Sequence, residues 1–132
     1  MTAFQDNGPE PGPMSAAQAF AIARIGIGAG LLVLPRTLLR PWVGSDASTP
    51  GAVFLARGMG GRDVALGLGL LLAAHRNAPV RGWLEAGMLA DGTDAVSSLL
   101  AARHLPNGGG WVMAAAAVVG VAAGRRLVSA LP

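Results

Sequence analysis

Apolar residues fall into four long runs along the chain, separated by short segments that are rich in proline, glycine and charge. The runs cover roughly residues 15–34, 50–74, 79–102 and 110–127. A helix that crosses a bilayer needs about 20 mostly apolar residues, so each run is long enough. The pattern predicts an all-α fold, an integral membrane bundle of four transmembrane helices in up-down order that fills residues 15–130.

The segments outside these runs fit the same division of the chain. Residues 1–14 are rich in proline and glycine, which predicts a disordered N-terminal tail. No arginine or lysine precedes the first run, so the basic region of a secretory signal is missing and we expect the run to remain uncleaved. Thr49 and Pro50 suit the N-cap and the first residue of the second helix. Residues 36–43 combine arginine, leucine and tryptophan, which is typical of a segment in the lipid headgroup region.

Composition favours a membrane over water. The chain is 52% hydrophobic and only 13% charged, with a mean hydropathy of +0.51. Its 20 glycines lie mostly inside apolar runs, where small residues let membrane helices approach closely. A soluble helical domain is the alternative, because the first three runs carry ionisable residues. The arginines are scattered and form no basic face, so we expect no nucleic-acid partner despite the net charge of +3.

Ionisable residues inside the runs are the strongest candidates for function. A charge near the bilayer centre costs about 2.5–3.5 kcal/mol on insertion scales, so such residues face the bundle interior and find partners. Residues at equal depth in two antiparallel helices have a constant sum of positions. This relation pairs every acid in the runs with an arginine: Arg24–Asp63, Arg62–Asp91, Arg57–Asp94, and Glu85 with Arg125 or Arg126.

The predicted intramembrane charge network has two interpretations. In the first, the network consists of ion pairs that hold the bundle in register and have no other function. Complete pairing favours this structural role, because it leaves no charge without a partner. Alternatively, part of the network lines a path for a substrate or for protons. The residues concerned are Arg24, Arg57, Arg62, Asp63, Glu85, Asp91, Asp94 and Arg126.

Small and polar residues recur at helical spacing. On the third run, Gly87, Asp91, Asp94 and Ser98 share one stripe, which we expect to point inward. Small residues spaced by four predict close helix contact within the chain or between copies. They are Gly26 and Gly30; Gly61, Ala65, Gly69 and Ala73; and Ala116, Gly120 and Gly124.

The sequence predicts no metal, cofactor or catalytic residue. Without cysteine there is no disulfide or thiolate chemistry. His75 and His104 fall at opposite sides of the predicted bundle and cannot share one ion. No set of nucleophile, base and orienting group is visible in the sequence. The sequence therefore does not decide whether the protein is an enzyme.

The residues at the run ends say little about orientation. Trp42, Trp83 and Trp111 fall near them, as interfacial tryptophans do, although chance placement is an alternative. The arginines in the loops and at the run ends divide four to three between the two sides, a slight excess that favours both termini in the cytoplasm.

Three stretches resemble a family of small actinobacterial four-helix membrane proteins that is known only as a domain of unknown function. They are residues 57–69, with Gly60, Arg62 and Asp63 at their centre, residues 81–85, and residues 90–94 with the Asp91 and Asp94 pair. The resemblance covers about residues 19–127. It implies a multi-pass location in the bacterial cell membrane, and it implies no activity or substrate.

Two functions are compatible with these features. The first is a non-enzymatic accessory or interaction subunit, embedded in the lipid bilayer as a homo-oligomer or beside another membrane protein. The second is a small transporter or proton-conducting protein that uses the mid-membrane arginine and aspartate residues. A cavity that reaches those residues would favour the second function, and small-residue faces left uncovered would favour the first.

Overall fold

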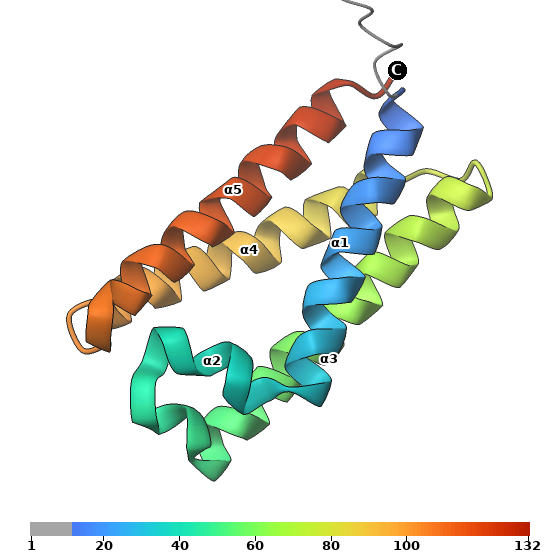
Figure 1. Cartoon of the computed structure of the whole chain (residues 1–132). Helices are drawn as coiled ribbons and strands as arrows, with labels where there is room; N and C mark the ends of the chain where they lie inside the picture. Colours follow the sequence, from blue (N-terminus) through green and yellow to red (C-terminus); the bar gives the residue numbers. More distant parts are fainter. Residues whose placement is uncertain (1–11) are drawn as a thin grey trace, which may run out of the picture.

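The computed structural model describes residues 12–132, which contain five α-helices and no strand (Figure 1). The all-α prediction is therefore confirmed for this part of the chain. The helices are α1 (Pro13–Val33), α2 (Pro35–Val43), α3 (Pro50–His75), α4 (Arg81–Ala101) and α5 (Gly109–Ser129), with 3₁₀ turns at Gly44–Ser48 and Pro106–Gly108.

The four long helices coincide with the four apolar runs. Proline begins α1, α2 and α3, where its missing N–H removes no helical hydrogen bond. Thr49 caps α3 as predicted, since its hydroxyl accepts a hydrogen bond from the Ala52 N–H at 3.2 Å. Most of the predicted tail lies outside the described residues, but Pro13 and Met14 already belong to α1.

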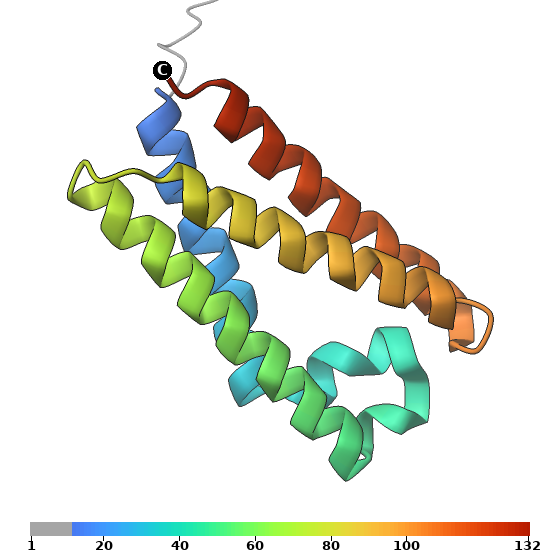
Figure 2. The same cartoon turned by 180° about the vertical axis from the view of Figure 1, so that it is seen from behind.

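The long helices form two hairpins. α1 packs mainly on α3, and α4 packs mainly on α5, whereas α3 and α4 contact each other at few positions. The hairpins meet at the end where the chain's C-terminus lies beside the start of α1 (Figures 1 and 2). Apolar residues of three long helices form the core there: Ala17, Ala21, Leu70, Ala73, Ala74, Val80 and Leu84, with Leu127 and Val128 of α5 packed against it.

At the other end the two hairpins diverge, and α2 lies between them. This short helix contacts α1, α3, α5 and the turn before α5. Its buried Leu39 packs with Ala47 and Ala56, while Arg36 and Arg40 are exposed. The segment predicted for the headgroup region is therefore an amphipathic helix at one end of the molecule (Figure 2).

Glycine sets the close approach of α1 and α3. A Cβ atom at Gly28 would lie 2.6 Å from the Gly60 carbonyl oxygen, and one at Gly60 would lie 2.6 Å from the Gly28 oxygen. A Cβ atom at Gly67 would lie 2.9 Å from the Ala21 carbonyl oxygen. Any larger residue would therefore separate the two helices.

The small-residue faces were predicted only partly, since Ala116 of α5 and Ala65 of α3 are exposed. Gly120 and Gly124 of α5 face Asp91 and Met88 of α4. Gly69 packs against the ring of Trp83, and Gly30 against Leu38. In contrast, a Cβ atom at Gly26 or Gly61 would meet no atom within 4 Å. The α1–α3 contact uses Gly28 and Gly60, which lie on other faces of the two helices.

Two helices of the described chain are long and apolar enough to cross a membrane. They are α1 and the C-terminal helix, counted with its 3₁₀ turn as Pro106–Ser129. α3 and α4 fall short of this test because of the charged residues in their middles, among them Arg62 and Asp91.

Candidate functional site

Five charged side chains from three helices meet near the centre of the molecule. They are Arg24 of α1, Arg62 and Asp63 of α3, and Asp91 and Asp94 of α4. Arg24 lies 11 residues after the start of α1 and 9 before its end. Asp63 lies 13 and 12 residues from the ends of α3, and Asp91 lies 10 from both ends of α4. We refer to these five residues as the central charge cluster.

Arg24 connects all three helices. Its Nη1 donates a hydrogen bond to Asp63 Oδ1 at 3.1 Å, and its Nη2 donates to Asp91 Oδ2. The side chain is only 8% exposed, and its guanidinium lies 5.5 Å from the ring centroid of Phe20, one turn earlier on α1. Gly87 of α4 packs beside the guanidinium, since a Cβ there would lie in ordinary contact with Nη2 at 3.4 Å.

Arg62 forms the second branch of the cluster. It binds Asp94 through two hydrogen bonds, from Nη1 at 3.0 Å and from Nη2 at 2.6 Å, in the fork geometry that suits a carboxylate. Its Nε and Nη2 also donate to Asp63 Oδ1, at 3.3 and 3.1 Å. Asp63 thus accepts hydrogen bonds from both arginines and links the two branches.

The central charge cluster is not electrically balanced. It contains three aspartates and two arginines, so full ionisation leaves one negative charge without a counterpart among the five residues. The sequence predicted a complete set of pairs, with the remaining positive charge supplied by Arg57. That expectation is wrong, because the exposed Arg57 donates instead to the Leu32 carbonyl at 3.3 Å.

A cavity of about 140 Å³ reaches the cluster. It lies between α1 and α5, which contact each other at few positions. Its charged wall consists of Arg24, Asp63 and Asp91, and the rest is Phe20, Ala23, Ile27, Ala116 and Gly120. A water molecule needs a polar site with only about 10–15 Å³ of probe-occupied volume, so this cavity has room for several.

Only one of the predicted ion pairs is present, Arg24–Asp63. The predicted Arg62–Asp91 pair is wrong. Asp91 forms its ion pair with Arg24, and Arg62 binds Asp94, about one helical turn farther along α4. The predicted Arg57–Asp94 pair is wrong as well. Arg57 instead lies at the C-terminal end of α1, where Pro35 has no N–H to offer the last carbonyls of that helix.

Glu85 does not pair with Arg125 or Arg126, contrary to the prediction. It is exposed and lies 3.6 Å from Arg81 on its own helix. Glu85 is two residues from the buried Gly87, which is about 200° around the helix, so its side chain points away from the interior. Arg125 and Arg126 are also exposed.

The sequence did not predict the contact between Arg24 and Asp91, because the constant sum of positions applies only to antiparallel helices. α1 and α4 run parallel in an up-down bundle, and residues at equal depth in parallel helices have a constant difference of positions. Arg24 and Asp91 lie 11 and 10 residues from the starts of their helices, so that comparison would have found them. The predicted inward stripe on α4 is present, since Gly87, Asp91 and Ser98 are buried.

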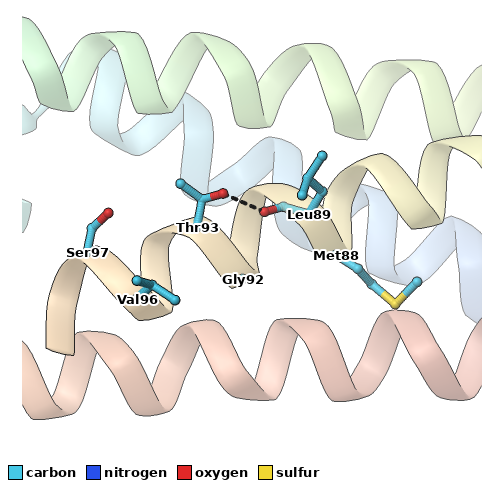
Figure 3. A pocket seen from close by; sticks show the side chains of 6 residues that line it. All are labelled: Met88, Leu89, Gly92, Thr93, Val96 and Ser97. Carbon is cyan, nitrogen blue, oxygen red and sulfur yellow. Dashed lines mark hydrogen bonds between the residues drawn. The ribbon is translucent and has the colours of Figure 1, made fainter. Parts of the chain in front are cut away.

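A second hollow, of about 380 Å³, lies along the outer side of α4 (Figure 3). Its lining comes from this one helix: Met88, Leu89, Gly92, Thr93, Val96 and Ser97. The Thr93 hydroxyl donates to the Leu89 carbonyl at 2.9 Å, so the helix satisfies this polar group internally (Figure 3). The hollow has no charged residue and carries no chemistry of its own.

Metal binding has no geometric support in residues 12–132, which contain no group of three or more histidine, cysteine, aspartate or glutamate residues able to hold an ion. His75 ends α3 and His104 follows α4, and both are exposed. No family model, curated protein or solved structure matches the chain.

Proposed function

We propose that the chain is a small multi-pass integral membrane protein in which α1, α3, α4 and α5 each cross the bilayer. The observation that carries this proposal is an inverted distribution of polarity. Arg24, Asp63 and Asp91 are 8–9% exposed, whereas Phe54 and Leu89 are 75% and 74% exposed. In water-soluble domains arginine and aspartate are mostly exposed, and large apolar side chains are mostly inside. Lipid requires the inverted arrangement, because apolar side chains face the acyl chains and charges find partners inside.

The helix lengths and the depth of the charges support the same arrangement. Each long helix has at least 21 residues, which span about 31 Å at 1.5 Å per residue and match a hydrocarbon core of about 30 Å. The central charge cluster then lies near the bilayer midplane. Arg62, Asp63, Asp91 and Asp94, which lower the hydropathy of α3 and α4, have partners within the cluster.

Cysteine accessibility tests the four crossings, and the cysteine-free chain suits it well. Single cysteines at Asn77 and Asn107, in the two loops that flank α4, should react with an impermeant reagent from opposite sides of the membrane. A cysteine at Ser45, beside α2, should react from the same side as Asn107. A cysteine at the exposed Leu89 should stay unlabelled in lipid, because thiolate does not form there. Labelling of the two loops from one side would contradict the topology.

Within the membrane, we propose a non-enzymatic role as an accessory or interaction subunit of the bacterial cell membrane. Small-residue faces that the fold leaves uncovered support this role. Gly26 of α1 and Gly58 and Gly61 of α3 would meet no atom within 4 Å if a Cβ were added. Such faces allow close approach of another membrane helix, from a second copy or from a different protein.

Cross-linking in native membranes tests the interaction role. The wild type should give a discrete cross-linked species, and Gly61→Leu should remove it without unfolding the protein. Gly51→Leu is the matched control, because Gly51 is equally open but lies at the N-terminal end of α3. A wild-type protein that stays uncross-linked, or a Gly61→Leu variant that cross-links as well as the wild type, would count against this role.

A small transporter or proton-conducting protein is the second candidate. The cavity beside Arg24, Asp63 and Asp91 favours it, as does the uncompensated negative charge of the cluster. Proton flux into liposomes that contain the purified protein is the direct test. Conduction should be lost in Asp91→Asn and retained in Glu85→Gln, because Glu85 is exposed on the same helix and lies outside the cluster.

A further inference from the structure

The charge imbalance of the central charge cluster has a chemical consequence. A full negative charge without a partner is costly at the bilayer centre, and closely spaced carboxylates relieve such repulsion by holding a proton. We propose that the cavity between α1 and α5 is a binding site for a single proton, carried by Oδ1 of Asp91. This proposal rests on the membrane location proposed above, and it adds the ligand and the residue that holds it.

Hydrogen bonding distinguishes Asp91 from the other two acids. Both oxygens of Asp94 accept from Arg62, and one oxygen of Asp63 accepts from both arginines. Asp91 accepts one hydrogen bond, at Oδ2, from a guanidinium that it shares with Asp63. Asp91 is therefore the least compensated of the three. Protonation at Oδ1 leaves Oδ2 free to keep the Arg24 hydrogen bond.

The surroundings of Asp91 leave its carboxyl group accessible from the cavity. Arg24 faces it from α1, Asp63 from α3, and Asp94 lies one turn away on α4. α5 contributes Ala116 and Gly120 at this level, neither of which is titratable. A Cβ atom at Gly120 would lie 2.5 Å from Asp91 Oδ2, so this glycine keeps space open for the carboxyl group. Water in the cavity can deliver and remove the proton.

The same geometry argues against a metal cation as the ligand. Calcium and magnesium take about six or more oxygen ligands, whereas the side chains of the cavity wall offer oxygen atoms only from the carboxylates of Asp63 and Asp91. The Arg24 guanidinium already occupies the space between the two carboxylates and repels cations. A proton needs only one oxygen and no coordination shell.

Infrared spectroscopy of the purified full chain in lipid nanodiscs tests the proposal. At neutral pH the wild type should show the carbonyl stretch of a protonated carboxylic acid, and Asp91→Asn should lose it. Glu85→Gln should keep the band, because Glu85 is exposed and outside the cluster. Absence of the band from the wild type, or its persistence in a folded Asp91→Asn variant, would overturn the assignment.

A measurement on the wild type alone keeps the proposal testable if Asp91→Asn does not fold. With carbon-13 at the aspartate carboxyl carbons, NMR in the same nanodiscs should show one protonated aspartate at neutral pH. If every aspartate signal is that of a carboxylate, the proton site is excluded. Cysteine labelling of Asn77 and Asn107 in these nanodiscs separates the two proposals: a missing proton with opposite-sided loops refutes the site, and same-sided loops refute the topology.

Discussion

Arg24 holds two carboxylates from different helices, so the stability of the bundle should depend on it more than on any exposed arginine. Arg24→Gln leaves Asp63 and Asp91 buried without their shared partner. Removal of one member of a buried ion pair costs about 3–5 kcal/mol, because the remaining charge is uncompensated. We expect a loss of this size in the free energy of unfolding, measured by denaturation in detergent micelles. Arg57→Gln removes the same charge at an exposed position and should cost about 1 kcal/mol or less, the value of one hydrogen bond. Equal losses would contradict the central role of Arg24.

The partners of Arg62 can be identified by a double-mutant cycle. Arg62→Gln and Asp94→Asn should show a coupling energy of about 1–3 kcal/mol in the free energy of unfolding, because the two side chains share two hydrogen bonds. Arg57→Gln and Asp94→Asn should be additive within about 0.5 kcal/mol, because Arg57 contacts the Leu32 carbonyl instead. Coupling between Arg57 and Asp94 that matches the first pair would restore the pairing predicted from the sequence.

At the residue scale, the sequence predicted the members of the central charge cluster more accurately than it predicted their ion-pair partners. Depth along a helix follows from position, so Arg24, Arg62, Asp63, Asp91 and Asp94 were all placed near mid-helix correctly. Direction around the helix depends on how the helices pack, which position alone does not determine. Glu85 shows the difference: it lies at a depth that matches Arg126 and points the other way.

Helices are the most predictable level of this molecule, because each start carries its own signal. Thr49 and Pro50 place the start of α3 correctly, and the apolar runs give the extents of α1, α4 and α5 within a few residues. The faces through which α1 and α3 meet were not predictable. Both helices contain several glycines, and Gly26 with Gly61 fits a small-residue pattern as well as Gly28 with Gly60 does.

Two adjacent glycines of α3 should therefore respond in opposite ways to the same substitution. In Gly60→Ala the new methyl group would lie 2.6 Å from the Gly28 oxygen, and overpacking of this kind costs about 1–3 kcal/mol. Gly61→Ala meets no atom within 4 Å and should be neutral or slightly stabilising, because alanine favours the helix. Unfolding of both variants in micelles measures the difference. Destabilisation by Gly61→Ala of the same size as by Gly60→Ala would show that the helices cross through another face.

At the scale of the whole molecule, the fold consists of two hairpins joined by few contacts. In the membrane location proposed above, apolar packing between helices gains little over contact with lipid, so polar contacts carry more of the specificity. Arg24–Asp91 and Arg62–Asp94 are the ion pairs that connect the hairpins in the described chain. The packing of Trp83 on Gly69 and the apolar core at the converging end complete the junction. The sequence could not predict this division, because four long apolar runs are equally compatible with a closed ring of helices.

This architecture makes a prediction for a divided chain. Residues 1–78 and 79–132, expressed together, should reassemble in the membrane and co-purify, because each half keeps its own closely packed helix pair. Asp91→Asn with Asp94→Asn in the second half removes both charged partners at the junction. Interhelical hydrogen bonds in membranes are worth about 0.6 kcal/mol on average and about 1.7 at most, so the loss of both pairs should lower recovery of the complex about eightfold to three-hundredfold. Glu85→Gln in the same half serves as the control and should leave recovery unchanged, since Glu85 contacts only Arg81 among the charged residues described. Undiminished co-purification of the doubly substituted half would mean that the apolar core, and not the central charge cluster, holds the two hairpins together.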